Sequence, residues 1–156
     1  MSQPTGISKL ETGIPGLDKI CIDGLPKGRT TLVAGTAGSG KTLLGAQFLV
    51  EGIAKKGESG VFVTFEESPE SLRTNFASMG WDMEAFEAEN KLAFVDASPQ
   101  VAEETSFVVG DFDMGALMAR IENAVRKVGA TRVVLDPLGA VFLRFGDSAL
   151  IRNELF

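Results

Sequence analysis

Apolar positions follow two patterns along the chain. The first is a run of consecutive apolar and β-branched residues, which predicts a buried strand. Four such runs occur, at residues 29–34, 61–65, 92–95 and 132–135. In the second pattern, apolar residues recur every three or four positions, which predicts a helix facing the core. Because such strands alternate with helices, we expect an α/β fold with a mostly parallel sheet that helices cover on both faces.

Polar residues and glycines mark where the predicted helices begin and end. A first helix starts near Lys41, and Gly57 is placed to end it in a left-handed conformation. Ser68 followed by Pro69 predicts the start of a second helix, which Gly80 closes. A brief helix is expected from about Asp82.

The last predicted helix is strongly amphipathic. Asp113 is expected to cap it and Gly129 to end it. Its apolar face consists of Leu117, Ile121, Ala124, Val125 and Val128. Residues 97–112, before this helix, have no regular pattern, and loops of that length are more often functional or mobile than structural.

Composition narrows the class of protein. The chain has 156 residues, of which 44% are hydrophobic and 23% charged, a balance typical of one globular domain. The net charge of −6 argues against binding to duplex nucleic acid, which depends largely on Lys and Arg. With no histidine and one cysteine, the sequence also argues against a zinc site.

The cellular compartment is predicted from what the sequence lacks. Cys21 has no partner for an internal disulfide and is best interpreted as a small packed residue. No apolar run approaches the roughly 18 residues that span a bilayer. The first residues have neither the charged nor the apolar region of a signal peptide. We therefore expect the protein in the cytoplasm.

The strongest chemical signal is the phosphate loop of residues 35–42, which reads Gly-x-x-x-x-Gly-Lys-Thr. A glycine-rich loop before a helix turns backbone N–H groups inward and forms an anion site. Lys41 is expected to reach the β- and γ-phosphates, and the Thr42 hydroxyl to ligate Mg²⁺. A strand precedes the loop and a helix follows it in the predicted order, so a chance match is improbable.

Two glutamates, Glu66 and Glu67, directly follow the predicted strand at residues 61–65. Ligands of open α/β sheets bind at the carboxyl ends of strands, so this pair is expected to face the phosphate loop. A carboxylate there can orient and deprotonate an attacking water. We expect Glu66 to take this role and Glu67 to assist it electrostatically. The alternative is a solvated acidic turn before a helix.

A third acidic residue, Asp136, ends the apolar run at residues 132–135. This is the Walker B pattern, in which the carboxylate holds Mg²⁺, often through water. Alone the pattern is weak, because many strands end in Asp. Its pairing with the phosphate loop makes the metal role the favoured interpretation.

Together, these motifs resemble KaiC-type domains of the RecA-like P-loop ATPase superfamily, over residues 12–156. The first, N-terminal ATPase domain of such circadian clock proteins is the most similar. Residues 1–11 are then an N-terminal extension. The segments that carry the resemblance are the phosphate loop and residues 12–18, 24–29, 60–69, 79–82, 96–99 and 152–156.

The resemblance implies specific functions. It implies a hexameric ring with ATP and Mg²⁺ between subunits, slow ATP hydrolysis, and clock partners of the KaiB type. It makes Glu66 the catalytic base with Glu67 beside it, and Asp136 the Walker B acid. Ser78 matches a position near the nucleotide. Phosphate contacts are implied at Gly38, Ser39, Gly40, Lys41, Thr42 and Leu43.

The end of the chain departs from the resemblance. In RecA-like domains a further strand lies between the Walker B strand and the phosphate-loop strand, and it would follow Phe156. The Lys and Arg residues that reach the neighbouring subunit would follow it too. We therefore expect residues 12–156 to be the front part of one domain in a longer protein. Kinase activity, which the family places in a second domain, is expected elsewhere in that protein.

Two alternatives to an ATPase remain open at this point. One is a non-catalytic module in which the nucleotide drives ring assembly and partner binding. The other is a RadA-like recombinase acting on DNA, which the net charge of −6 and the lack of a basic, aromatic stretch make less favoured.

Overall fold

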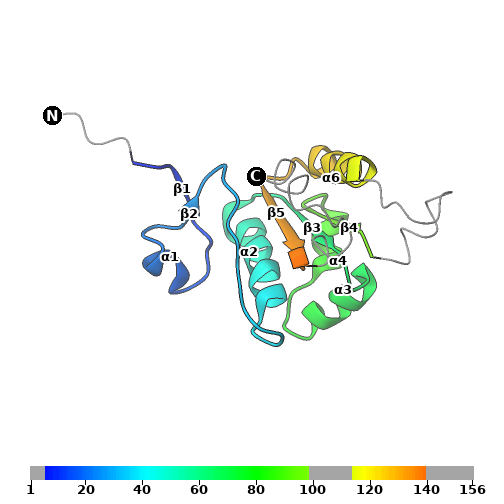
Figure 1. Ribbon diagram of the computed structural model, residues 1–156, viewed down its shortest axis with the longest axis horizontal. Helices are drawn as coiled ribbons and strands as arrows, with labels where there is room; N and C mark the ends of the chain where they lie inside the picture. Colours follow the sequence, from blue (N-terminus) through cyan, green and yellow to red (C-terminus); the bar gives the residue numbers. More distant parts are fainter. Residues whose placement is uncertain (1–5, 99–113, 140–156) are drawn as a thin grey trace.

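The computed structural model describes residues 6–98 and 114–139 of the chain (Figure 1). Its centre is a three-stranded sheet in the order β4-β3-β5. The strands are β3 (Gly60–Thr64), β4 (Leu92–Asp96) and β5 (Arg132–Asp136). Both pairings are parallel, and they align the last residue of β3 with the last residues of β4 and β5. All three carboxyl ends therefore lie at one edge of the sheet.

The central strand, β3, is buried along its whole length. Its side chains alternate between two apolar clusters, as the period of two in a strand requires. Val61 and Val63 pack in one cluster with β4 and the last helix. Phe62 packs in the other, where its ring centroid lies 6.0 Å from that of Phe76 and 5.6 Å from that of Phe94.

Helices cover both faces of the sheet, which confirms the α/β prediction (Figure 1). On one face, α2 (Lys41–Lys56) buries Ala46, Leu49 and Ile53 against the Phe62 side of the sheet. On the other, α6 (Met114–Val128) buries the predicted face, with Leu117, Ile121 and Val128 most deeply. Gly57 ends α2 in the left-handed conformation, as predicted.

Two shorter helices, α3 (Pro69–Ala77) and α4 (Met83–Ala88), follow β3. The Ser68 hydroxyl accepts a hydrogen bond from the Ser71 N–H at 3.2 Å, and the Asp82 carboxylate accepts one from the Ala85 N–H at 2.9 Å. Both residues are therefore N-caps, as predicted for Ser68, and the brief helix expected from about Asp82 is confirmed. The Gly80 N–H bonds the Ala77 carbonyl in the turn that ends α3.

The prediction of a strand at residues 29–34 is wrong. This segment pairs with no strand of the described sheet, and its residues are exposed. β5 bonds only β3 among the described strands, so its other edge does not reach this segment. A segment of residues with high β-propensity becomes a strand only where a partner strand lies beside it, because burial and pairing contribute most of that propensity.

A small N-terminal unit was not predicted. β1 (Lys9–Leu10) pairs antiparallel with β2 (Leu25–Pro26), and α1 (Leu17–Ile20) lies between them in the sequence. Strands of two residues give no periodic signal, which explains why the sequence did not reveal them.

Two predictions fall largely outside the described residues: the loop at residues 97–112, of which only the first two residues are described, and the cap at Asp113. No helix within residues 6–98 or 114–139 is long and apolar enough to cross a bilayer.

Candidate functional site: a phosphate loop at the carboxyl edge of the sheet

The phosphate loop leads directly into α2, whose amino end differs from those of α3 and α4. Its N-cap is Gly40, which has φ of 84° and provides no side-chain hydrogen bond. Gly38 also has positive φ, at 77°, a conformation that side chains rarely adopt. A helix leaves its first N–H groups without intrahelical partners. In α2 no side chain caps them and no acidic residue lies in the first turn, so an anion is the fitting partner.

The loop is closed on itself by Lys41. Its ammonium group donates hydrogen bonds to the Gly35 carbonyl at 2.9 Å and the Thr36 carbonyl at 2.8 Å, and lies 3.5 Å from the Ser39 hydroxyl. A Cβ at position 35 would overlap the Ser39 hydroxyl, so any larger residue there would displace that hydroxyl. The result is a tight loop with a cation at its centre.

The loop meets β5 through a direct contact. The Thr42 hydroxyl donates a 2.7 Å hydrogen bond to Oδ2 of Asp136 across 94 residues of sequence. The structure therefore brings the two predicted metal-binding residues together. Thr42 lies in the first turn of α2, and Asp136 is the last residue of β5.

The two glutamates lie at the same edge of the sheet. The N–H of Phe65, which precedes Glu66, donates to the Asp136 carbonyl at 3.0 Å, so the chain leaves β3 beside β5. The Glu67 carboxylate accepts hydrogen bonds from the Ser71 hydroxyl at 3.4 Å and the Asn75 amide at 3.3 Å. The exposed Glu66 carboxylate forms no hydrogen bond or ion pair with any residue in the described part of the chain. The pair is thus unequal, with Glu67 held by α3 and Glu66 available.

Ser78 lies at the end of α3 and has no hydrogen bond to the phosphate loop among the described residues. It is the C-cap of α3, and its hydroxyl donates to the Asn75 carbonyl at 2.6 Å. Its role near the nucleotide stays a prediction.

A shallow hollow of about 330 Å³ adjoins the loop. Its volume is at the small end of the range for ligand pockets. Leu43, a predicted phosphate contact, contributes to its wall and also packs on the Phe62 cluster. The full lining is Val33, Ala34, Ser39, Gly40, Lys41, Leu43, Leu44 and Gln47.

The residues at this edge suit Mg²⁺. Mg²⁺ prefers oxygen ligands and usually takes one or two from the protein and the rest from phosphates and water. The Thr42 hydroxyl and the Asp136 carboxylate, 2.7 Å apart, supply such a pair. The described residues contain no cluster of three or more Asp, Glu, His or Cys side chains for a metal. A magnesium ion here would therefore depend on nucleotide phosphates.

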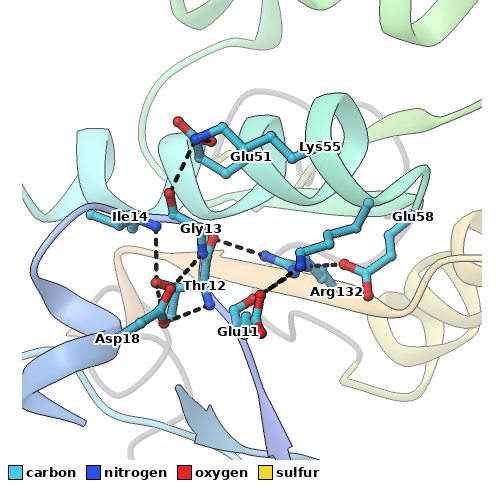
Figure 2. A network of polar contacts seen from close by, with 10 residues as sticks. Glu11, Thr12, Gly13, Ile14, Asp18, Glu51, Lys55, Glu58 and Arg132 are labelled. Carbon is cyan, nitrogen blue, oxygen red and sulfur yellow. Dashed lines mark hydrogen bonds and ion pairs between the residues drawn. The ribbon is translucent and has the colours of Figure 1, made fainter. Parts of the chain in front are cut away.

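A buried polar network at the other end of β5 was missed by the sequence analysis (Figure 2). Arg132, the first residue of β5, lies among Glu11, Thr12 and Glu58. The signal within β5 was a charged residue at the start of an apolar strand, and composition alone does not show whether such a residue is buried or exposed.

Asp18 organises the segment that meets Arg132. Its carboxylate accepts hydrogen bonds from the Thr12 N–H and hydroxyl, both at 2.8 Å, and from the Gly13 N–H at 3.0 Å (Figure 2). Burial acts to raise the pKa of Asp18, but these hydrogen bonds and the charge of Arg132 outweigh it and hold the pKa below its usual value.

The comparisons with known proteins agree with this geometry. A family model described as "ATPase: KaiC" matches residues 10–156. The chain belongs to the KaiC ATPase family. The RecA-like α/β fold of that family accounts for the parallel sheet and for the loop at its carboxyl edge.

Individual relatives carry clock-protein names. The chain is 58% identical over 151 residues to "Circadian clock protein KaiC3" of Synechocystis sp., a match that covers 97% of this chain and 30% of that protein. It is 47% identical over 156 residues to "Circadian clock oscillator protein KaiC" of Parathermosynechococcus lividus, which covers 100% of this chain and 28% of that protein. The chain thus spans less than a third of the length of these relatives.

Proposed function

We propose that this chain forms the ATP and Mg²⁺ site of a KaiC-like ATPase that hydrolyses ATP slowly. The observation that carries the proposal is the 2.7 Å contact between Thr42 and Asp136. It joins the phosphate loop to the end of β5, next to the strand that leads into Glu66. A site for phosphate, a site for the metal and a candidate base thus share one edge of the sheet.

Each residue has a defined task in this proposal. Lys41 exchanges its loop carbonyls for the β- and γ-phosphates, while the loop residues Gly38, Ser39 and Gly40 offer backbone N–H groups. Thr42 and Asp136 hold Mg²⁺, which neutralises charge on the phosphates. Leu43, at the start of α2, provides a further phosphate contact. Ser78 contacts the nucleotide at a greater distance from the loop.

Glu66 is the proposed general base. An exposed carboxylate that no residue within 6–98 or 114–139 binds is free to accept a proton from water that attacks the γ-phosphate. Glu67 is bound by Ser71 and Asn75, which suits an electrostatic and orienting role rather than proton transfer.

The test compares Glu66→Gln with Glu67→Gln in the full-length protein. Glu66→Gln should abolish phosphate release and leave ATP affinity nearly unchanged, because the amide keeps the shape but does not accept the proton. Glu67→Gln should slow release less. Unchanged hydrolysis in Glu66→Gln would remove Glu66 from the role of base.

We also propose a hexameric ring with ATP between subunits and a KaiB-type partner, in the cytoplasm. Support comes from the clock-protein names of the relatives. Size measurement with ATP and with ADP tests the ring. If the ring assembles on bound ATP and no phosphate is released, the protein is instead a nucleotide-dependent assembly module.

A further inference from the structure

Helix α2 runs antiparallel to strand β5 and contacts it at both ends of the strand. At the edge that carries the site, Thr42 of α2 bonds Asp136 of β5. At the far end, Arg132 of β5 bonds the Phe48 carbonyl of α2 at 2.8 Å, and its guanidinium lies 4.5 Å from the centre of the Phe48 ring. The metal-binding pair is therefore one end of an interface whose other end is Arg132.

Arg132 is buried and forms four hydrogen bonds. Its side chain is 1% exposed, and its Nε forms a 2.6 Å ion pair with Glu58. Nη2 donates to the Glu11 carbonyl at 2.7 Å, and Nη1 donates to the Thr12 carbonyl at 3.2 Å (Figure 2). One side chain thus joins β5, α2, the turn after α2 and the N-terminal segment.

Two glycines of α2 bring the helix close to β5 between these ends. A Cβ at Gly45 would lie 2.8 Å from Cγ1 of Val134, and one at Gly52 would overlap the Arg132 guanidinium. From Thr42 to Gly52 the helix rises about 15 Å, and from Arg132 to Asp136 the strand rises about 13 Å. Because α2 and β5 are each continuous between their contacts at Arg132 and at Thr42, we expect a shift at the Arg132 end to alter the contact at the Thr42 end.

We propose that Arg132 is a positioning residue for the magnesium site, because it fixes the register of α2 against β5 and thereby the contact between Thr42 and Asp136. The inference rests on the proposed function. Arg132 touches neither the nucleotide nor the metal in this scheme. Its effect should appear in the part of nucleotide affinity that depends on Mg²⁺, because only that part needs Thr42 and Asp136 together.

The chain offers a matched control in Arg73. Its guanidinium forms two hydrogen bonds with Glu87, at 2.6 and 3.0 Å, and lies 5.0 Å from the centre of the Phe94 ring. Like Arg132, it thus pairs with a glutamate and stacks on a phenylalanine ring. It links α3 to α4 and has no hydrogen bond to α2 or β5 in the described part of the chain.

The experiment compares Arg132→Lys with Arg73→Lys in the full-length protein. A lysine keeps the charge but cannot span the separate acceptors that a guanidinium reaches. Binding of a fluorescent ATP analogue is measured with Mg²⁺ and with excess EDTA, and Tm is measured alongside. In Arg132→Lys, the gain in affinity from Mg²⁺ should fall about tenfold, while binding in EDTA changes little. Arg73→Lys should keep the wild-type gain in affinity from Mg²⁺, although it also lowers Tm.

Gly52→Ala is a second variant, which displaces the Arg132 guanidinium without removing it. It should also reduce the increase in nucleotide affinity that Mg²⁺ causes. If both variants keep the wild-type gain, the positioning role is overturned and the proposed function stands. If the wild-type protein binds no nucleotide, or binds it equally in EDTA, the proposed function fails and the inference fails with it.

Discussion

The strand β3 and the segment at residues 29–40 both lead to the same edge of the sheet, yet their surroundings are opposite. Every residue of β3 is buried between two layers of helices. In the other segment, Leu32 is 67% exposed and Val33 is 47% exposed. Both contain a run of apolar, β-branched residues, so composition does not explain the difference. β3 has a strand on each side, whereas residues 29–34 have none in the described sheet.

This difference indicates that β3 contributes mainly to stability and the phosphate loop mainly to ligand binding. β3 contributes large apolar side chains to both clusters and has paired backbone groups along its length. The phosphate loop contributes almost no buried apolar area, and its lysine bonds carbonyls at the surface. Substitutions in β3 should therefore change the free energy of unfolding, and substitutions in the loop should change ligand binding.

The largest expected effect is that of Phe62→Ala. Removing a ring in contact with Phe76 and Phe94 should lower the free energy of unfolding by about 3–5 kcal/mol, because the cavity closes only in part. Urea unfolding can be followed by the fluorescence of Trp81, which packs on Phe76. A loss below about 1 kcal/mol would mean that β3 is not the stabilising centre.

The next largest effect is that of Lys41→Ala on binding. The loss of a cation that meets triphosphate should lower ATP affinity roughly 100-fold, or about 2.7 kcal/mol. The free energy of unfolding should change by less than about 0.5 kcal/mol, because the three contacts of Lys41 are exposed. Lys27→Ala, an exposed lysine outside the loop, is the control for net charge. Titration with a fluorescent ATP analogue measures the affinity.

Asp18 provides a smaller effect that depends on pH. Its pKa is lowered in the folded state. The ionised carboxylate therefore adds to the free energy of unfolding in full above the unfolded pKa of about 3.9, and this contribution is lost as pH falls through the folded pKa. Asp18→Asn should cost about 1 kcal/mol at pH 7, since the three hydrogen bonds lose a charged acceptor. The difference from wild type should shrink below about pH 4. Urea titrations at pH 7 and pH 3.5 measure it, and an equal difference at both values would contradict the assignment.

The smallest effect is expected for Leu32→Ser. The Leu32 side chain is 67% exposed, so its replacement should change the free energy of unfolding by less than about 0.5 kcal/mol. The same urea assay provides the comparison with Phe62→Ala. A loss of several kcal/mol in Leu32→Ser would show that residues 29–34 are buried in solution, as β3 is.

The features that depend on local chemistry were predictable from the sequence. The caps at Ser68 and Asp82, the helix after the phosphate loop and the approach of Asp136 to Thr42 all follow from short motifs with known mechanics. The features that depend on distant partners were not. Whether residues 29–34 form a strand depends on a neighbour, which a run of apolar residues does not specify.

The Arg132 network was not predictable for the same reason, because it depends on partners that are distant in the sequence. Four of its hydrogen bonds reach residues that lie between 74 and 121 positions away in the sequence. No periodicity relates such positions, and the acceptors are mostly backbone carbonyls, which leave no mark in composition. Gly45 and Gly52 gave a weak signal, as glycines inside a helix, but not the identity of the side chains that they admit.

The long span of the Arg132 contacts also concerns the order of synthesis. Glu11 and Thr12 leave the ribosome about 120 residues before the arginine that binds their carbonyls. At about 5–20 residues per second, they wait roughly 6–24 s for this partner. The segment that contains Glu11 and Thr12 is thus made well before the arginine that binds its carbonyls. A nascent chain halted before Arg132 should leave residues 9–18 open to protease, and one halted well after it should protect them.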